Sequence, residues 1–434
     1  MGQPVAMDDD ATASTEGWRP RVTDVGVLRV PATRVDDTHE DAIAVVTSAD
    51  PLTPAFRENV VLSAVPTQGS ITADSLAAID ETRRAQVWTH IVAVSPWAQG
   101  NRGRRMIFLY EIDRVVVAVA KYTFTSGDQR IDLTCSADLT TFTTLLPIFD
   151  EIAAFSELSN TAERELTNQS GDQLPVLDAA ATARFGEPLE SLDFLRGSQV
   201  APSADYVLPA GSLDQLWSTK DRGLVSTATR SSEVGTALRE AGLTSRFGGS
   251  TTKAREVIAP LQTSTFRLAS VLQSAGETQQ WSCFAAPDGL ALVRSQSTTV
   301  HATSPESLSI VGLPAAIARL IAWLPLDPYW AAIDEADRDR VFDDDLLNAK
   351  LCGERVPSPK RLGPVLEECW SADWVSVQIG MHDSTDGLPL IQANGKYFHR
   401  DATGGGSLLR PVPSDTVFLG ILDLVGRHRS RGAS

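Results

Sequence analysis

The pattern of apolar and polar residues between positions 242 and 325 predicts a module in which helices cover antiparallel strands. Apolar residues from Val257 to Leu272 recur at roughly helical spacing. Residues 281–286 and 290–293 are short apolar runs of strand type, and the Pro-Asp-Gly sequence between them favours a tight turn. The sequence therefore predicts a helix followed by a β-hairpin.

Two prolines indicate where helices are interrupted or begin in this module. Pro260 is expected to kink or interrupt the first helix, because proline lacks the backbone N–H that continues a helical ladder. Ser304 followed by Pro305 is typical of a helix start, with serine as N-cap and proline at the first helical position. Apolar residues from Leu308 to Leu324 then supply a buried stripe, so a second helix is predicted after the hairpin.

The region 26–159 predicts a separate α+β domain, and the polar, acidic residues 1–25 before it are expected to be disordered. Helices are predicted near 72–84 and 140–155, together covering one face of an antiparallel sheet. The runs that alternate like half-buried strands are 25–30, 42–47, 59–65, 86–94, 104–112, 114–124 and 129–135.

Residues 206–434 predict a second α+β domain built from two related halves, after a linker at 160–205 with short helices. Each half has helices, then an antiparallel meander, then a closing helix, so the domain is expected to be a pseudo-duplicated sheet flanked by helices. In the second half, helices are predicted within 334–351, 362–370 and 414–425, and strands at 374–379, 389–393, 397–400 and 407–410.

Composition is that of a soluble globular protein. The chain has 434 residues, of which 42% are hydrophobic and 21% are charged. Its net charge of −17 makes nucleic acid or an anionic membrane surface an unsuitable main partner. A signal peptide and a membrane-spanning apolar run are not recognised, and the four cysteines form no CxxC pair, so a cytoplasmic protein with free thiols is expected.

Candidate catalytic and metal-binding motifs all have simpler interpretations. His399 with Asp401 lacks the nucleophile context that a general base serves, so a strand residue is favoured. The acidic run beginning at Asp343 leads straight into Leu346, which favours the first turn of a helix over a cation site. The glycines before Ser407 lack a P-loop lysine and favour a hairpin loop. The sequence thus predicts no enzyme activity, cofactor or metal.

A binding surface is the better hypothesis for the strand at 374–379. Strand side chains alternate between faces, so Trp374 and Gln378 lie opposite the face of Val377. Tyr397 and His399 are expected on a neighbouring strand, and together these four residues are the candidate partner-binding set, since aromatic side chains concentrate binding energy at protein interfaces. The alternative, that Trp374 belongs to the core, stays open.

The N-terminal domain resembles a known fold. Phe56-Arg57-Glu58-Asn59-Val60-Val61, followed by an alanine-bearing helix, a long meander and a terminal helix, is similar to the PsbP-like fold and, more narrowly, to LpqN/LpqT-type actinobacterial proteins. LpqN-type members are usually exported lipoproteins. This sequence shows no lipid-attachment cysteine near its start, so the envelope location of that family is not carried over.

The C-terminal domain resembles the EspG type of type VII (ESX) secretion chaperone. The likeness covers 206–427 and rests on the order of Gly242-Leu243, Ile258-Ala259-Pro260, Ala322-Trp323-Leu324-Pro325, Trp374-Val375-Ser376-Val377 and Asn394-Gly395-Lys396-Tyr397. It implies a non-enzymatic cytoplasmic chaperone or adaptor that keeps a PE/PPE- or WxG-type secretion client soluble. The alternative is a structural or regulatory protein-binding module outside secretion, acting as a homodimer or larger homo-oligomer.

Overall fold

The fold was analysed in a computed structural model that describes residues 17–432, except for 54, 98–102, 159–189, 221–229, 300–301, 325, 329–336, 338 and 383. Contacts divide the described chain into two compact units. Unit 1 comprises the described residues up to Arg84 together with Ser95–Ile107 and Val117–Glu190. Unit 2 comprises Ala85–Val94, Phe108–Val116 and the described residues from Ser191 onward.

An antiparallel seven-stranded sheet organises the N-terminal part of the chain, as its alternating sequence predicts. Its strand order is β3-β4-β5-β9-β8-β7-β6. The strands are β3 Arg34–Asp37, β4 Ala44–Ser48, β5 Asn59–Pro66, β6 Thr89–Trp97, β7 Gly103–Ile112, β8 Val115–Ser126 and β9 Gln129–Asp138.

A β-hairpin precedes this sheet, formed by β1 Trp18–Thr23 and β2 Gly26–Pro31. The expectation of disorder up to residue 25 is therefore wrong for β1; residues 1–16 lie outside the described range. Trp18 explains the difference, because its ring packs edge-on against Phe155 with centroids 5.4 Å apart and anchors an otherwise polar strand.

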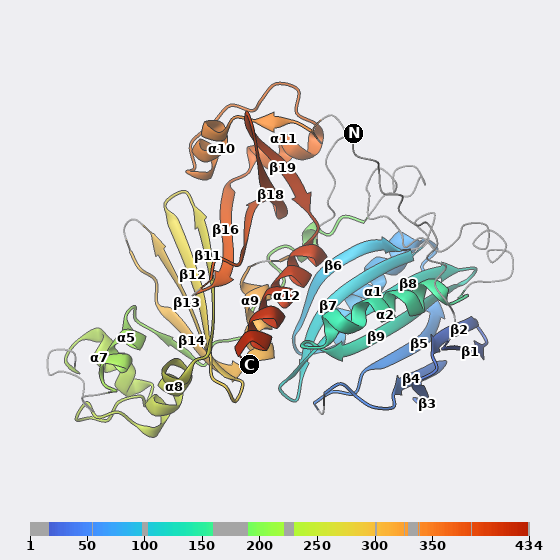
Figure 1. Ribbon diagram of the computed structural model, residues 1–434, viewed down its shortest axis with the longest axis horizontal. Helices are drawn as coiled ribbons and strands as arrows, with labels where there is room; N and C mark the ends of the chain where they lie inside the picture. The colour runs from blue at the N-terminus through green and yellow to red at the C-terminus, as the bar shows by residue number, and fades with distance from the viewer. Residues whose placement is uncertain are drawn as a thin grey trace, which may run out of the picture. The chain divides into compact units, whose positions relative to one another are not determined.

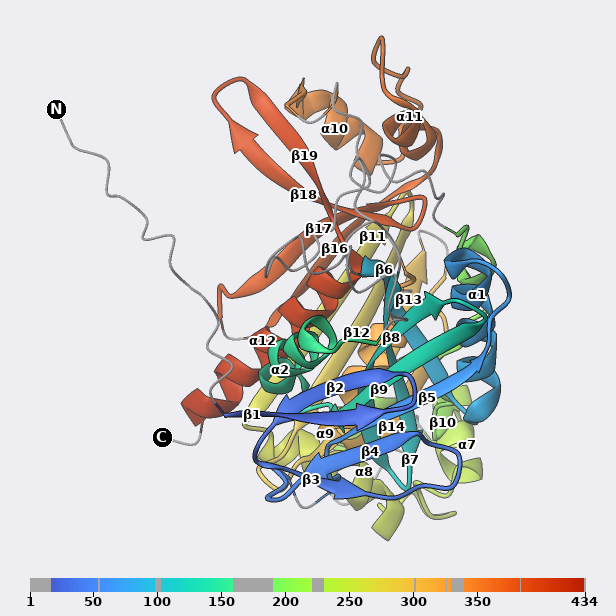
Figure 2. The ribbon, with the colours of Figure 1, turned by 90° about the vertical axis from the view of Figure 1, so that its right-hand side faces the viewer.

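Two helices pack on the seven-stranded sheet, and they lie on opposite faces. The Tyr122 hydroxyl donates to Asp150 of α2 (Phe142–Phe155), whereas Thr125 donates to Asp74 of α1 (Ile71–Ala85). Residues three apart on one strand point to opposite faces, which places α1 and α2 on either side of β8 (Figures 1 and 2). The structure thus keeps the α+β class but differs from the single covered face expected from sequence.

Unit 2 contains an antiparallel ten-stranded sheet with the order β10-β14-β13-β12-β11-β16-β17-β18-β19-β15. The first five are β10 Tyr206–Leu208, β11 Phe266–Ser274, β12 Glu277–Ala285, β13 Leu290–Thr299 and β14 Glu306–Gly312. The second five are β15 Val341–Phe342, β16 Trp374–Met381, β17 Gly387–Ala393, β18 Lys396–Thr403 and β19 Gly406–Val412.

The ten-stranded sheet consists of two halves with the same topology, which confirms the predicted pseudo-duplication. Each half runs through a short edge strand, helices, a four-stranded meander and a closing helix, and in each the edge strand pairs with the last strand of the meander. The halves join where β11 pairs with β16. The helices are α5 Ser212–Ser218, α7 Glu233–Glu240, α8 Thr252–Thr263 and α9 Leu313–Trp323, then α10 Asp344–Leu351, α11 Pro364–Ser371 and α12 Ser414–Gly432.

Two segments of the first half differ from the sequence prediction. Leu268 and Leu272 lie on β11, after α8 has ended, and Leu308 lies on β14. The closing helix α9 begins only at Leu313, with Pro314 in its first turn. A separation of four positions fits one helical turn and also one face of a strand, so the spacing of Leu268 and Leu272 does not discriminate between them.

The two faces of the ten-stranded sheet are covered differently. Helices α9 and α12 pack on one face of the sheet. Trp281 of β12 and Val377 of β16 are buried on this face. On the other face, α5, α7 and α8 lie at one end and α10 and α11 at the other, as Figure 1 shows. The core at the first end is Leu208, Leu213, Leu216, Leu238, Leu243, Ala254, Val257, Ile258, Leu292 and Leu308. The core at the second end is Phe342, Leu347, Leu366, Cys369, Trp370, Trp374, Ile391, Ala393, Phe398 and Leu409.

Candidate binding surface

The four strands at the middle of the ten-stranded sheet, β12, β11, β16 and β17, have one buried and one accessible face. Along β11 and β16, residues such as Leu268, Leu272, Val377 and Ile379 are buried. Their neighbours in sequence, including Gln378, are exposed or half-buried. We call the accessible face of these four strands the central face.

Strand register aligns the side chains of the central face into rows. Gln280 is paired with Gln296 on one side and with Val271 on the other. Val271 is in turn paired with Gln378, and Gln378 with Pro389. This glutamine row crosses five strands without a charged residue.

The adjacent row is made of small residues. Ser282 pairs with Ala269, Ala269 with Gly380, and Gly380 with Gly387. A Cβ placed on Gly387 would lie 2.8 Å from the Ile379 carbonyl oxygen, so the close strand pairing itself requires glycine there. Along this row a ligand can approach the sheet backbone closely.

Arg294, at one border of the central face, has its charge compensated. Arg294 of β13, which pairs with Ser282, lies next to the small-residue row. Its Nε atom is 2.8 Å from a carboxylate oxygen of the buried Glu306 and its Nη1 atom is 3.7 Å from Asp214. The glutamine row and the small-residue row therefore carry no charge, and two arginines lie beside them: the compensated Arg294, and the exposed Arg267 at the start of β11.

The structure separates the four predicted partner-binding residues. Gln378 is exposed on the central face, as expected. Trp374 lies on the same face but under α10 and α11, only 3% exposed, and its indole Nε1 donates to the Cys369 carbonyl at 2.9 Å. The alternative of a core Trp374 is thus correct, and Trp374 is excluded from an exposed surface.

Tyr397 and His399 lie on the opposite face of the sheet. Register places Tyr397 of β18 in line with Gln392 and Val375, the residues that alternate with Trp374. Tyr397 is fully buried; its hydroxyl donates to the Leu324 carbonyl at 2.8 Å, and burial raises its pKa. His399 is half-buried, with Nδ1 3.2 Å from the Pro389 carbonyl oxygen. A single surface holding all four residues is therefore wrong.

The central-face residues of the first half are not among the predicted binding residues, all of which lie on the second half. The alternation in β12 places Gln280 and Ser282 opposite Trp281 and Cys283, and this signal is visible in the sequence. What sequence could not supply is the β11–β16 pairing, which brings Gln280 and Gln378 into one row across Val271.

The other candidate motifs have structural roles where they are described. Asp343 is the N-cap of α10, accepting from the backbone N–H groups of Asp345 and Leu346, so the acidic run is a helix start as predicted. The glycines before Ser407 lead into β19 of a hairpin, also as predicted. His382 ends a strand pair, and its neighbour Asp383 lies outside the described residues.

Buried thiols and the search for metal ligands add no second site. Burial raises the pKa of Cys283 to about 12 and that of Cys369 to about 11, which keeps both thiols protonated and unreactive at neutral pH. Among the described residues, no group of three or more His, Cys, Asp or Glu side chains could hold a metal ion. Within the same residues, no helix is long and apolar enough to span a membrane.

Comparison with known proteins identified no family: no family model and no curated protein matches this chain. Solved structures similar to part of it include LpqN of Mycobacterium tuberculosis, at 16% identity over 30% of this chain and 84% of that one, with a TM-score of 0.24. CyanoP, the PsbP protein of Synechocystis, is 9% identical over 35% of this chain and 98% of that one, with a TM-score of 0.27.

A protein of unknown function from Pseudomonas aeruginosa is also similar, at 12% identity over 31% of this chain and 93% of that one, with a TM-score of 0.24. LpqN and the PsbP protein belong to the two groups that the N-terminal part resembles in sequence. At these TM-scores the likenesses assign no family and support no function.

Proposed function

We propose that this protein is a non-enzymatic, cytoplasmic chaperone or adaptor that binds another polypeptide on its central face. The observation that carries the proposal is the uncharged glutamine row, which continues through the joint between two topologically equivalent halves. Cores of protein interfaces are depleted in charged residues, and glutamine side chains offer both hydrogen-bond donors and acceptors to a polypeptide.

The dimensions of the central face suit a polypeptide ligand. Four strands about 4.8 Å apart span about 14 Å, and eight residues at about 3.3 Å each span about 26 Å, giving roughly 380 Å². A standard protein interface buries about 800 Å² on each partner. A client covering this face would therefore also contact the helices at its two ends, α5, α7 and α8 and then α10 and α11.

Binding to the face is favoured over addition of a client strand at a sheet edge. The edge strands β10 and β15 have three and two residues. Such short edges are a common protection against pairing with other chains and offer few free backbone groups. The face, in contrast, has eight- and nine-residue strands at its centre.

The nature of the client follows from the EspG resemblance of residues 206–427. On that resemblance, the client is a secreted protein of the PE/PPE or WxG type, kept soluble before export. An open polar sheet face with helices at both ends is compatible with a client that lies across the strands. No nucleic acid, cofactor or metal enters the proposal.

Gln378→Arg tests the proposal by introducing a charge at the centre of the glutamine row. With a co-expressed PE/PPE- or WxG-type protein encoded nearby, we expect the client Kd to rise at least about tenfold, since an unpaired charge at an interface core opposes binding. Isothermal titration calorimetry and the soluble yield of client provide the measurement. Gln129→Arg, at an exposed position on β9 of unit 1, is the matched control.

Equal affinity of the Gln378→Arg variant and the wild type would contradict binding at the central face. The runner-up, a homo-oligomeric module outside secretion, gives a different result. In that case light scattering detects a client-free dimer that Gln378→Arg dissociates, and no secretion client is recovered.

A further inference from the structure

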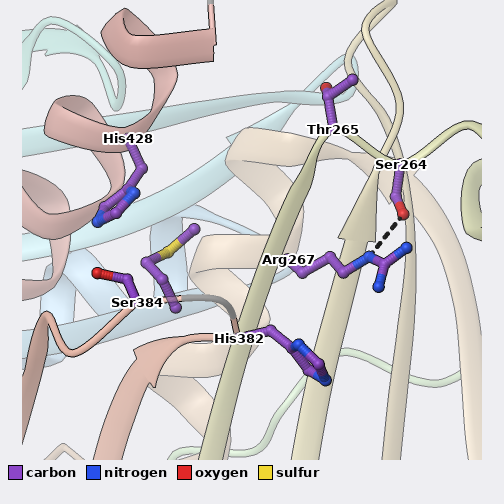
Figure 3. A pocket seen from close by; sticks show the side chains of 7 residues that line it. Ser264, Thr265, Arg267, His382, Ser384 and His428 are labelled. Atoms are coloured by element: carbon purple, nitrogen blue, oxygen red, sulfur yellow. Dashed lines mark hydrogen bonds between the residues drawn. The ribbon is translucent and has the colours of Figure 1, made fainter.

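A pocket lies beside the joint between the halves, at the start of β11 and the end of β16. Its volume is about 260 Å³. Figure 3 shows Arg267 and His382 on one side and Ser384 and His428 on the other. The pocket, here named the Arg267 pocket, is lined by Ser264, Thr265, Arg267, Met381, His382, Ser384 and His428.

The lining of the Arg267 pocket is basic and rich in hydroxyl groups. It contains one arginine, two histidines, two serines and a threonine, and none of the lining residues is acidic. The chain as a whole carries a net charge of −17 and only six histidines. A local set of cationic and cationisable groups therefore contrasts with the rest of the protein and favours an anionic ligand.

Hydrogen bonds position the charged groups of this pocket. Arg267 Nε donates to the Ser264 hydroxyl at 3.0 Å, which orients the guanidinium group (Figure 3). In the described part of the chain, no hydrogen-bond partner is found for its two terminal NH2 groups. The backbone N–H of His382 donates to the Arg267 carbonyl at 3.1 Å and ties the loop after β16 to β11.

Asp386 is the acidic group next to the pocket. His428 Nε2 lies 3.1 Å from its carboxylate, within hydrogen-bonding distance. The backbone N–H of Asp386 in turn donates to the Ser384 hydroxyl at 3.0 Å, so the loop is internally braced. Arg267 is consequently the group with the permanent positive charge available to a ligand.

We propose that the Arg267 pocket binds a phosphate group, either as inorganic phosphate or as a small phosphomonoester. The Arg267 guanidinium group supplies several N–H donors and the three lining hydroxyls can each donate or accept, a set that suits the several oxygens of a phosphate group. Pockets for drug-sized ligands start at about 300 Å³. The smaller volume here admits a phosphate group with at most a short organic substituent.

Titration of the full chain with inorganic phosphate and with glycerol 3-phosphate tests this site, using calorimetry at low ionic strength and pH 6. We expect saturable binding that Arg267→Gln weakens at least about tenfold, the loss typical of a hydrogen bond to a charged group. Arg255→Gln, at an exposed position on α8, controls for net charge. His382→Gln is the second variant and should also weaken binding.

Tighter binding of either ligand supports the proposal and distinguishes free phosphate from an esterified source. Absence of saturable binding by both ligands would overturn it, as would Arg267→Gln binding like the wild type while its circular dichroism is unchanged. Failure of this test is distinguishable from failure of the proposed function, because phosphate binding is measured without client on Arg267 at the start of β11 and on His382 after β16, whereas the client test uses Gln378.

Discussion

His90 makes the stability of unit 2 depend on pH through a single buried side chain. It belongs to the part of β6 that contacts assign to unit 2, and its Nε2 atom is 3.0 Å from the Leu326 carbonyl oxygen. Within the described residues its Nδ1 atom has no hydrogen-bond partner. Burial lowers the pKa of His90 to about 4, and the contact with Leu326 only partly opposes that effect.

The expected result is a loss of stability on acidification. Between pH 6.5, the ordinary pKa of histidine, and the native value of about 4, the unfolded state binds a proton that the folded state excludes. The unfolding free energy therefore has its full value, as far as His90 is concerned, above pH 6.5. It decreases as the pH falls toward 4, by about 3 kcal/mol in total. Urea denaturation of the wild type and of His90→Gln at several pH values between 7 and 4.5 measures it.

Carboxylates also titrate in this range. The contribution of His90 is therefore obtained from the difference in the pH dependence of the unfolding free energy between the wild type and His90→Gln. His90→Gln should show a shallower decline of unfolding free energy with acidification than the wild type. Parallel slopes for the wild type and His90→Gln would show that His90 is accessible to protons in the folded state.

At the scale of elements, the sequence predicts correctly those strands that are bounded by clear turn residues. The prediction is wrong where the spacing of apolar residues fits both a helix and a strand. The hairpin of β12 and β13 follows from its Pro-Asp-Gly turn, and the strands of the second half follow from alternation. The sequence predicts a helix over 306–312 because Ser304 and Pro305 are typical of a helix start, whereas the structure has β14 there. Tertiary contacts of Glu306 decide otherwise.

Glu306 shows why the local signal was misleading. Its side chain is fully buried on β14, where one carboxylate oxygen accepts from the backbone N–H of Leu213 at 2.6 Å. Glu306 therefore caps the N-terminus of a helix, as its sequence context suggests. The helix is α5, however, and Leu213 is 93 residues away in sequence. No local pattern identifies a capping partner at that distance. The same limit hid the pairing of β11 with β16 and, with it, most of the central face.

Glu306→Ala should destabilise the protein by at least about 2 kcal/mol, because it removes a buried carboxylate from both a helix N-terminus and Arg294. The matched control is Asp214→Ala, which removes the other carboxylate near the same arginine. Asp214 is 73% exposed and 3.7 Å from Arg294, so less than about 1 kcal/mol is expected. Urea denaturation followed by circular dichroism compares them; similar losses in the two variants would contradict the capping role.

At the scale of the whole molecule, the ten-stranded sheet makes its two halves mechanically continuous. Six residue pairs join β11 and β16, from Leu268 opposite Met381 to Gln273 opposite Ser376. Helices α9 and α12 follow the two meanders and pack on the same face of the sheet. A substitution that weakens the β11–β16 pairing should therefore destabilise both halves, although each half has its own helices and core.

Val271→Pro tests this continuity, since proline in a central strand removes a ladder hydrogen bond and leaves its buried partner unsatisfied, at a cost of about 1–3 kcal/mol. Val271→Thr retains the backbone N–H and isolates the side-chain change. Val207→Pro, on the edge strand β10, should cost far less. Thiol labelling read by mass spectrometry reports each half separately, through buried Cys283 in the first and buried Cys369 in the second.

In Val271→Pro both thiols should become labelled faster and by the same factor, because loss of the joint opens the sheet as one cooperative unit. The exposed Cys352 gives the intrinsic labelling rate in every variant. Faster labelling of Cys283 with Cys369 still protected would show instead that the halves open separately. The central face would then be a seam between two modules, and a client bridging Gln280 and Gln378 would stabilise the joint as it binds.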